Sequence, residues 1–213
     1  MTQNQKRQNV RTSELQNFRT SELPFPLILG SASPRRKKIL DALGIPFTVA
    51  APHTEETHDP SDPVRTVVCN ATEKYRAIRA AHPAAAVITA DTLVWFDGQL
   101  IGKPADLAEA ARFLRAFSGR TQIVYTGIAL GLPGQGAPDI RVEASSVTFK
   151  TLSEAAIQTY LEKTRPLDRA GAYDIDENGD LLIASYSGSR TNIMGLPQGP
   201  VRDWLARIIV KSH

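Results

Sequence analysis

The hydrophobic positions along the chain change their period several times, and this predicts alternating strands and helices. Apolar runs at 27–29 and 86–96 are typical of buried strands, and the second run is broken by Asp91 and Thr92. Ser33-Pro34 and Asp62-Pro63 each place an N-cap residue before proline, which is typical of a helix start. We therefore expect a helix that closes at Gly44 and a longer one from residue 63. The apolar positions at helical spacing in the longer helix are Val64, Val67, Val68, Ala71 and Tyr75.

The rest of the chain continues the mixture of strands and helices. Asp97-Gly98 indicates a hairpin turn, and Asp106 with Glu109 has the spacing of a capping box for a helix to residue 117. Further strands are expected at 46–50, 99–101, 121–130, 140–149 and 181–187, and further helices at 153–163 and 200–211. The order is neither strictly alternating nor all β. It predicts an α/β protein with a long mixed sheet, helices on its faces and a ligand cleft near the strand ends.

The beginning of the chain contains a short tandem repeat. Residues 8–15 and 16–23 share the order Gln-Asn-x-Arg-Thr-Ser-Glu-Leu, and two copies of eight residues are too few for a solenoid. The segment is polar and precedes Pro24 and Pro26. We expect a flexible N-terminal extension over 1–24 and a single folded domain over 25–213.

Composition and charge exclude several classes of protein. The chain has 213 residues, 42% of them hydrophobic and 22% charged, which excludes a disordered or collagen-like protein. It contains neither a membrane-spanning apolar run nor the apolar stretch of a secretory signal, and its single cysteine, Cys69, fits a reducing compartment. We therefore expect a cytoplasmic protein that does not bind membranes.

The net charge of +3 is unevenly distributed along the chain. Residues 1–24 hold four basic and two acidic side chains, which leaves 21 basic against 20 acidic residues in the expected domain. A nearly neutral domain has no broad field to attract a polyanion, so no stable nucleic-acid binding is expected and anion binding must be local.

One segment has the residue types of a local phosphate site. In the stretch from Gly30 to Arg36, Ser31 and Ser33 precede the expected helix start, while Arg35 and Arg36 follow it. Unpaired backbone N–H groups at a helix N-terminus, serine hydroxyls and guanidinium groups all bind phosphate oxygens. An N-capped surface helix with two solvated arginines is the alternative interpretation.

Acidic residues supply the candidate chemistry. Asp91 interrupts an apolar strand, where a carboxylate is costly unless it is paired, binds a metal or faces a cleft. It is therefore the leading candidate for a general base or metal ligand, with an exposed strand end as the alternative. Glu55-Glu56 lies in a polar loop whose carboxylates suit Mg²⁺ or Mn²⁺, although a solvated acidic loop would look the same.

Three other patterns resemble known motifs without completing them. The stretch from Gly98 to Lys103 has the wrong spacing for a phosphate loop, and the acidic run from Asp174 to Asp180 lacks the last glutamate of a calcium loop. We interpret the acidic run as a solvent-exposed turn. Asn70-Ala-Thr72 fits a glycosylation sequon, but it falls inside an expected helix of a chain with no secretion signal.

Several ordered blocks together resemble a known family, the Maf-like nucleoside triphosphate pyrophosphatases. The resemblance runs from about residue 27 to 205 and leaves the N-terminal extension outside. The blocks are Ser31-Ala-Ser-Pro-Arg-Arg36, Ala90-Asp-Thr92, Gly102-Lys-Pro104, Ser118-Gly-Arg120 with Tyr125-Thr-Gly127, Leu167-Asp-Arg-Ala-Gly-Ala-Tyr173 and Gly188-Ser-Arg-Thr-Asn-Ile-Met-Gly-Leu-Pro197.

The resemblance implies a fold, a reaction and a set of site residues. It implies two lobes around a nucleotide cleft, as in inosine triphosphate pyrophosphatases, and hydrolysis of a nucleoside triphosphate to monophosphate and diphosphate with Mg²⁺ or Mn²⁺. The substrates would be standard or modified nucleotides, removed from the pool, with a link to cell-division arrest. By the resemblance, Glu56 and Asp91 bind metal and activate water. The substrate-binding positions would be Ser31, Ser33, Arg35, Arg36, Lys74, Thr92 and Lys103.

The resemblance also bears on the base preference and on the assembly. A dTTP/UTP-cleaving subgroup has Arg, Thr and Gln at three positions, where this chain has Arg35, Thr92 and Asp176. A carboxylate only accepts hydrogen bonds, whereas a glutamine amide also donates them, so Asp176 alters the expected base contact. The resemblance is compatible with a homodimer. The alternative function is a nucleotide-binding regulator of cell division without significant turnover.

Overall fold

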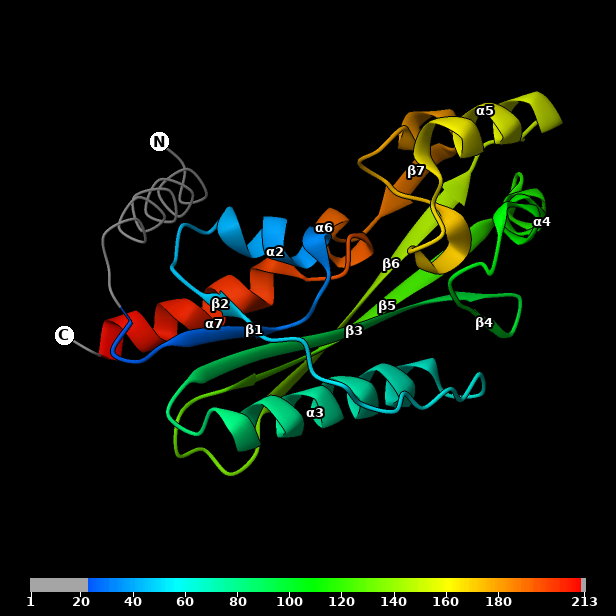
Figure 1. Ribbon diagram of the computed structural model, residues 1–213. Coiled ribbons are helices and arrows are strands. Elements are labelled where there is room, and N and C mark those ends of the chain that lie inside the picture. The colour runs from blue at the N-terminus through cyan, green and yellow to red at the C-terminus, as the bar shows by residue number, and fades with distance from the viewer. Residues whose placement is uncertain (1–22, 212–213) are drawn as a thin grey trace, which may run out of the picture.

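A seven-stranded mixed sheet forms the centre of the computed structural model, which describes residues 23–211 (Figure 1). The strand order is β2-β1-β3-β5-β6-β7, and β4 also pairs with β3. The strands are β1 (Leu27–Gly30), β2 (Thr48–Val49), β3 (Ala86–Phe96), β4 (Gln99–Ile101), β5 (Thr121–Gly131), β6 (Asp139–Phe149) and β7 (Ile183–Ser187). The helices are α2 (Pro34–Asp41), α3 (Pro63–Ala81), α4 (Leu107–Phe117), α5 (Glu154–Thr164), α6 (Arg190–Ile193) and α7 (Gln198–Lys211), with 3-10 helices η2 (Ala170–Ala172) and η3 (Gly179–Leu181). The predicted α/β class with a long mixed sheet is confirmed.

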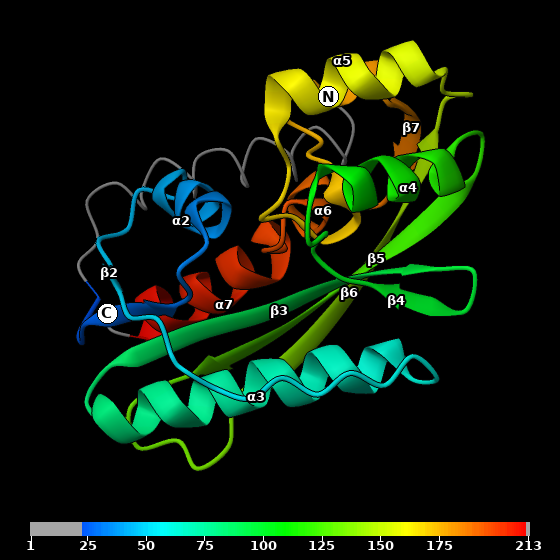
Figure 2. The same ribbon diagram turned by 45° about the vertical axis from the view of Figure 1, so that its right-hand side comes forward.

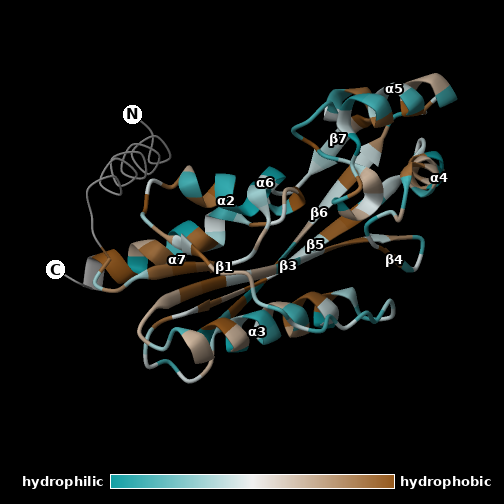
Figure 3. Ribbon diagram, in the orientation of Figure 1, coloured by the Kyte–Doolittle hydropathy of each residue, from teal (hydrophilic) through white to brown (hydrophobic). Residues whose placement is uncertain are grey.

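Helices cover both faces of the sheet, and they divide the core into three parts. Helix α3 lies alone on one face, whereas α2, α7, α4 and α5 lie on the other (Figures 1 and 2). Under α3 the buried cluster includes Tyr75 and Val87. On the opposite face, one cluster joins β1 and β3 to α2 and α7, and a second joins β3 and β5 to α4 and α5. The apolar interior of both clusters is visible as brown ribbon in Figure 3.

A polar seam, formed by Thr92 and Thr126, separates the two apolar clusters on the same face of the sheet. Alternate residues of a strand point to the same side of a sheet, and on this side β3 presents Ile88 to the first cluster and Val94 to the second. Between them lies Thr92, which pairs in register with Thr126 of β5. The hydroxyls of the two threonines are 3.0 Å apart. The sheet therefore passes without interruption under two apolar cores with a polar seam between them.

One edge of β3 is open in the middle of the strand. Strand β1 pairs with β3 from Ala86 to Thr89, and β4 pairs with the same edge from Val94 to Phe96, while β5 occupies the other edge. Residues 90–93 consequently have no strand beside them on that edge. Ala86 N donates to Pro26 O on the β1 side, and every second residue points its backbone groups the same way, so those of Thr92 face the opening. The predicted cleft near the strand ends has its structural basis here.

Most predicted elements are confirmed. The N-cap residues that predicted the helix starts form the expected hydrogen bonds in the structure. The side chains of Ser33, Asp62, Asp106 and Ser153 each accept a bond from the backbone N–H three residues later, at the helix starts. The hairpin at Asp97-Gly98 joins β3 to β4 as expected.

Four details of the prediction were wrong. The strand expected at 46–50 is reduced to two exposed residues at the sheet edge, and the strand expected from residue 181 begins at Ile183 after a 3-10 helix. Helix α6 was missed, because four residues are too few to give a period. Val64 is 43% exposed rather than part of the buried stripe, whereas the polar residues Thr66 and Asn70 of the same helix are buried.

The described part of the chain begins at residue 23, next to the folded core. Residues 1–22 of the expected extension lie outside the described residues, while Leu23 packs against the first core cluster. Within residues 23–211, no helix is long and apolar enough to cross a bilayer.

Candidate active site

A cleft of about 480 Å³ opens beside the unpaired edge of β3. It is lined by the loop between β1 and α2, by residues of α3 and β3, and by the segment after α5. Nine of the ten site residues predicted from the sequence line this cleft. The predicted site residues in the lining are Ser31, Ser33, Arg35, Arg36, Glu56, Lys74, Asp91, Thr92 and Lys103.

A lysine joins the two predicted acids. Lys74 Nζ lies 2.6 Å from Asp91 Oδ1 and 2.7 Å from Glu56 Oε1, so side chains from α3, β3 and the preceding loop meet at one point. Asp91 is 7% exposed. Burial raises the pKa of Glu56, but the hydrogen bond and charge of Lys74 outweigh it, and the pKa lies below its usual value. The ammonium group of Lys74 therefore holds the two carboxylates close together.

An amide that sequence analysis did not assign to the site completes this cluster. Asn70 is buried, and its Nδ2 donates to Asp91 Oδ2 at 3.0 Å. The same side chain bonds both backbone groups of Thr57, the residue after Glu56. A signal was available: Asn70 precedes Lys74 by four residues on the expected helix, so both side chains share a face.

The start of α2 presents donors to the cleft. Ser31 Oγ accepts bonds from Ser33 N and from the Arg36 guanidinium, both at 3.2 Å, which leaves its own proton free to donate. Ser33 caps the helix, and the backbone N–H of Arg35 has no hydrogen-bond partner in residues 23–211. This is the geometry that binds phosphate oxygens at helix N-termini.

Arg36 points inward and connects three parts of the chain. Its guanidinium donates to Gly195 O at 2.7 Å, to Thr92 Oγ1 at 3.0 Å and to Ser31 Oγ. Burial lowers the pKa of this group below its usual value. Gly195 has φ +105°, and a Cβ there would approach both Thr92 and Arg36. The structure thus gives Arg36 an internal bonding role at the polar seam, although it also lines the cleft.

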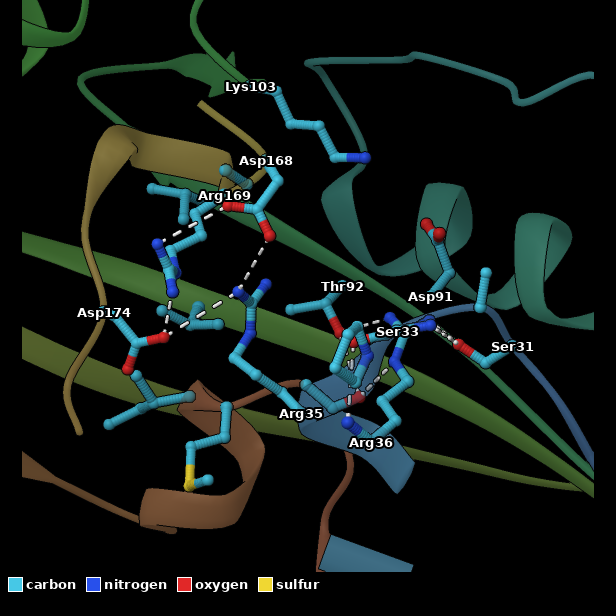
Figure 4. Close-up of a pocket in the computed structure, with 18 of the residues that line it drawn as sticks. Ser31, Ser33, Arg35, Arg36, Asp91, Thr92, Lys103, Asp168, Arg169 and Asp174 are labelled. Carbon is cyan, nitrogen blue, oxygen red and sulfur yellow. Dashed lines mark hydrogen bonds and ion pairs between the residues drawn. The ribbon is translucent and has the colours of Figure 1, made fainter. Parts of the chain in front are cut away.

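Two other cations lie at the mouth of the cleft. Arg35 lies between two carboxylates, with Nη1 3.8 Å from Asp168 and 3.8 Å from Asp174 (Figure 4). Arg169 binds Asp174 more closely, at 2.9 Å. Lys103 points toward the cleft from the loop after β4 and has no ion-pair or hydrogen-bond partner within the described chain (Figure 4). Arg35 and Lys103 are therefore available to an anion entering from solvent.

Asp176 is the predicted site residue that does not line the cleft. Its carboxylate lies 2.6 Å from Arg190 and 3.8 Å from Lys38, and its backbone N–H donates to Asp174 Oδ1. Asp174, which the sequence placed in a solvent-exposed turn, is instead 7% exposed and lines the cleft. That expectation was wrong because Asp174 accepts two backbone bonds and pairs with Arg169, which compensates its burial.

The donor set at Glu56 and Asp91 fits a hard divalent cation. No group of three or more His, Cys, Asp and Glu side chains converges anywhere in residues 23–211. Mg²⁺ is commonly bound by one or two carboxylates and takes its remaining ligands from phosphates and water. Two convergent carboxylates in the same cleft as the start of α2 are compatible with that requirement, and Glu56 Oε2 has no partner within the described chain.

Part of the cleft lining is apolar. The apolar side chains in it include Val94, Val124, Tyr173, Ile193 and Met194. Burial raises the pKa of the Tyr173 hydroxyl well above its usual value, so this group stays protonated. A flat aromatic ligand group suits such walls, whereas the charged part of the lining suits phosphates.

Known proteins share much of this sequence. The family model described as "Maf-like protein" matches residues 26–208. A dTTP/UTP pyrophosphatase of Moorella thermoacetica is 42% identical over 183 residues, covering 84% of this chain and 93% of the relative. A dTTP/UTP pyrophosphatase of Symbiobacterium thermophilum is 44% identical over 172 residues, covering 80% and 88%. A solved nucleoside-triphosphatase, a dITP/XTP pyrophosphatase of Mycobacterium abscessus, covers 87% of this chain and 97% of its own with TM-score 0.42 and 14% identity. The extent of the family match and the identity to these relatives lead to one conclusion: the chain belongs to the family of Maf-like proteins.

Proposed function

We propose that this chain is a nucleoside triphosphate pyrophosphatase, which converts a triphosphate and water into a monophosphate and diphosphate. The observation that carries the proposal is the Glu56–Lys74–Asp91 cluster, which lines the same cleft as the N-terminus of α2. Carboxylates activate water or hold a cation, and helix amides with hydroxyls hold phosphate. Relatives named dTTP/UTP pyrophosphatase support the same activity.

Substrate binding follows from the two parts of the cleft lining. The α2 N-terminus, Ser31 and Arg35 hold the phosphate chain, and Lys103 adds charge from the opposite side. The apolar part of the lining, which includes Tyr173 and Met194, receives the base. The proposal requires the α-phosphate to lie beside Asp91.

The reaction requires an attacking water, charge neutralisation and a stabilised leaving group. The water oxygen bonds to the α-phosphorus, and the bond from that phosphorus to the bridging oxygen breaks, so diphosphate leaves. Asp91 accepts the water proton at Oδ1 or orients the water, while Arg35 and the amides of α2 stabilise the negative charge on the leaving diphosphate. A divalent cation at Glu56 and Asp91 would neutralise phosphate oxygens and lower the pKa of a bound water.

Within this activity we propose dTTP and UTP as the preferred substrates, on the names of the relatives. The Asp176 carboxylate pairs with Arg190 and Lys38 and does not line the cleft. We therefore propose that the base is selected by groups that do line the cleft, among them Thr92 and Asp174.

Product analysis tests the proposal. The purified chain is incubated with the four ribonucleotide and four deoxyribonucleotide triphosphates and with modified ones, with Mg²⁺, with Mn²⁺ and with chelator. We expect monophosphate and diphosphate in equal amounts, with metal, and no orthophosphate. The alternative, a nucleotide-binding regulator of cell division, predicts tight binding of a triphosphate that remains intact.

A further inference from the structure

Asn70 has an unusually complete set of hydrogen bonds for a buried amide. Its residue is 2% exposed, and its Nδ2 donates to Thr57 O at 3.1 Å and to Asp91 Oδ2 at 3.0 Å. Its Oδ1 accepts from Thr57 N at 2.8 Å. Both amide protons and the amide oxygen are therefore used, and turning the amide by 180° would break all three bonds.

These bonds join three separate parts of the chain. Asn70 belongs to α3, Asp91 belongs to β3, and Thr57 lies in the irregular segment before α3, directly after Glu56. The two bonds to Thr57 resemble one rung of a β-ladder and fix the backbone at that residue. The position of Glu56 is thus set from α3, which also carries Lys74 one turn later.

We propose that Asn70 is a positioning residue that fixes the Asp91 carboxylate and docks the Glu56 segment onto α3, so that both acids face one point in the cleft. The inference rests on the proposed pyrophosphatase function, because it assigns Asn70 an effect on turnover.

The geometry gives this role a specific kinetic signature. The bond from Asn70 occupies Asp91 Oδ2 and thereby directs Oδ1 toward Lys74 and the cleft. Within residues 23–211, the polar groups at the start of α2 that are proposed to bind phosphate make no hydrogen bond with Asn70. Loss of Asn70 should therefore lower kcat and leave KM nearly unchanged. Partners that orient the ligands of a reactive centre typically contribute about 10–100-fold to activity.

The chain offers a matched control on the same helix. Thr66 is buried one turn before Asn70, and its hydroxyl bonds Asp59 N at 3.2 Å and Asp59 O at 3.1 Å. Thr66 holds the same segment to α3 but makes no hydrogen bond with Glu56 or Asp91. Thr66→Val therefore removes buried hydrogen bonds of a similar kind and keeps the hydrogen bond from Asn70 to Asp91.

The experiment compares Asn70→Leu and Thr66→Val with the full-length parent chain. We expect kcat to fall about 10–100-fold in Asn70→Leu with KM within about threefold, and both constants to stay within about threefold in Thr66→Val. In the metal-free protein, hydrogen exchange at the Thr57 amide should become faster in Asn70→Leu, because that N–H loses its acceptor.

A second variant separates the two roles and remains informative if Asn70→Leu does not fold. Asn70→Asp keeps an oxygen for Thr57 N–H, so slow exchange at that amide should persist. It removes the donor to Asp91 and sets a carboxylate against it, so kcat should still fall.

Two outcomes overturn the inference. One is equal kcat in Asn70→Leu, Asn70→Asp and Thr66→Val, and the other is unchanged exchange of the Thr57 amide in Asn70→Leu. If the parent chain itself hydrolyses no triphosphate, the proposed function fails, and the effect on turnover inferred for Asn70 fails with it.

Discussion

Replacing Lys74 by methionine tests the electrostatic basis of the site most directly. The ammonium nitrogen lies 2.6 Å from Asp91 Oδ1 and 2.7 Å from Glu56 Oε1, so these two oxygens are at most 5.3 Å apart, the sum of the two distances. Without the ammonium, two like charges at that distance repel by about 3 kcal/mol at an effective dielectric constant of about 20. Because Glu56 is 44% exposed and can turn toward water, we expect Lys74→Met to lose roughly 1–3 kcal/mol of unfolding free energy.

Urea unfolding at pH 7 with chelator measures this loss. Lys37→Met is the matched control, because Lys37 pairs with Asp41 at a similar distance of 2.7 Å but half exposed, and an exposed pair contributes about 0.5 kcal/mol or less. The pH dependence gives an independent check. Lys74 lowers the pKa of Glu56 in the folded state, so the stabilisation is present above the unfolded pKa and is lost as the pH falls through the folded pKa.

The difference in stability between parent and Lys74→Met should therefore shrink as the solution is acidified below about pH 4, the usual range of a glutamate pKa. Added Mg²⁺ or Mn²⁺ should restore part of the stability of the variant at pH 7, since a cation can take the place of the ammonium group. Equal unfolding free energies of parent and Lys74→Met at pH 7, or a loss that persists unchanged in acid, would refute the reasoning.

Three further predictions concern single positions. Asp91→Asn should lower kcat by at least about 100-fold while circular dichroism and the unfolding temperature stay near those of the parent; undiminished turnover would remove Asp91 from the mechanism. Arg36→Lys should destabilise the chain by roughly 2–4 kcal/mol in urea unfolding, because one ammonium group cannot reach Gly195 O, Thr92 and Ser31 together, and a change under about 0.5 kcal/mol would contradict the internal role. Burial raises the pKa of Glu143, so its ionised form opposes folding at neutral pH; Glu143→Gln should stabilise the chain at pH 7, and the gain should disappear as the pH falls through the raised folded pKa to below the unfolded one. A gain that is the same at pH 7 and in acid would show that charge is not its cause.

The sequence predicts the fold well where the signal is local. Ser33, Asp62, Asp106 and Ser153 cap helices as expected, since an N-cap bond depends on residues only three positions apart. The hairpin at Asp97-Gly98 and the buried strand before it are likewise local patterns. The prediction of a strand over 46–50 was wrong in length, because a strand at the edge of a sheet makes few contacts and only two of these residues pair with β1.

The site is predictable in part. The run of serines and arginines and the interrupted apolar strand at Asp91 identify residues that meet in the cleft. Asn70 and Asp174 are different, because their importance comes from partners 21 and 5 residues away whose positions depend on tertiary packing. Arg36 illustrates the same limit: its sequence position suggests a phosphate ligand beside Arg35, but the turn at Gly195 provides it with internal acceptors.

The continuity of the central strands has a consequence for how this molecule unfolds. Strands β3, β5 and β6 each have eleven residues, and β3 and β5 contribute side chains to both apolar clusters on one face of the sheet. Because the two clusters share these strands, disorder of the strands at one cluster also disrupts the packing of the other. The two halves on either side of the cleft should therefore unfold as a single cooperative unit. Any change in the width of the cleft would then come from twisting of the sheet or from the surrounding loops, since the three strands leave no flexible linker on which two rigid halves could pivot.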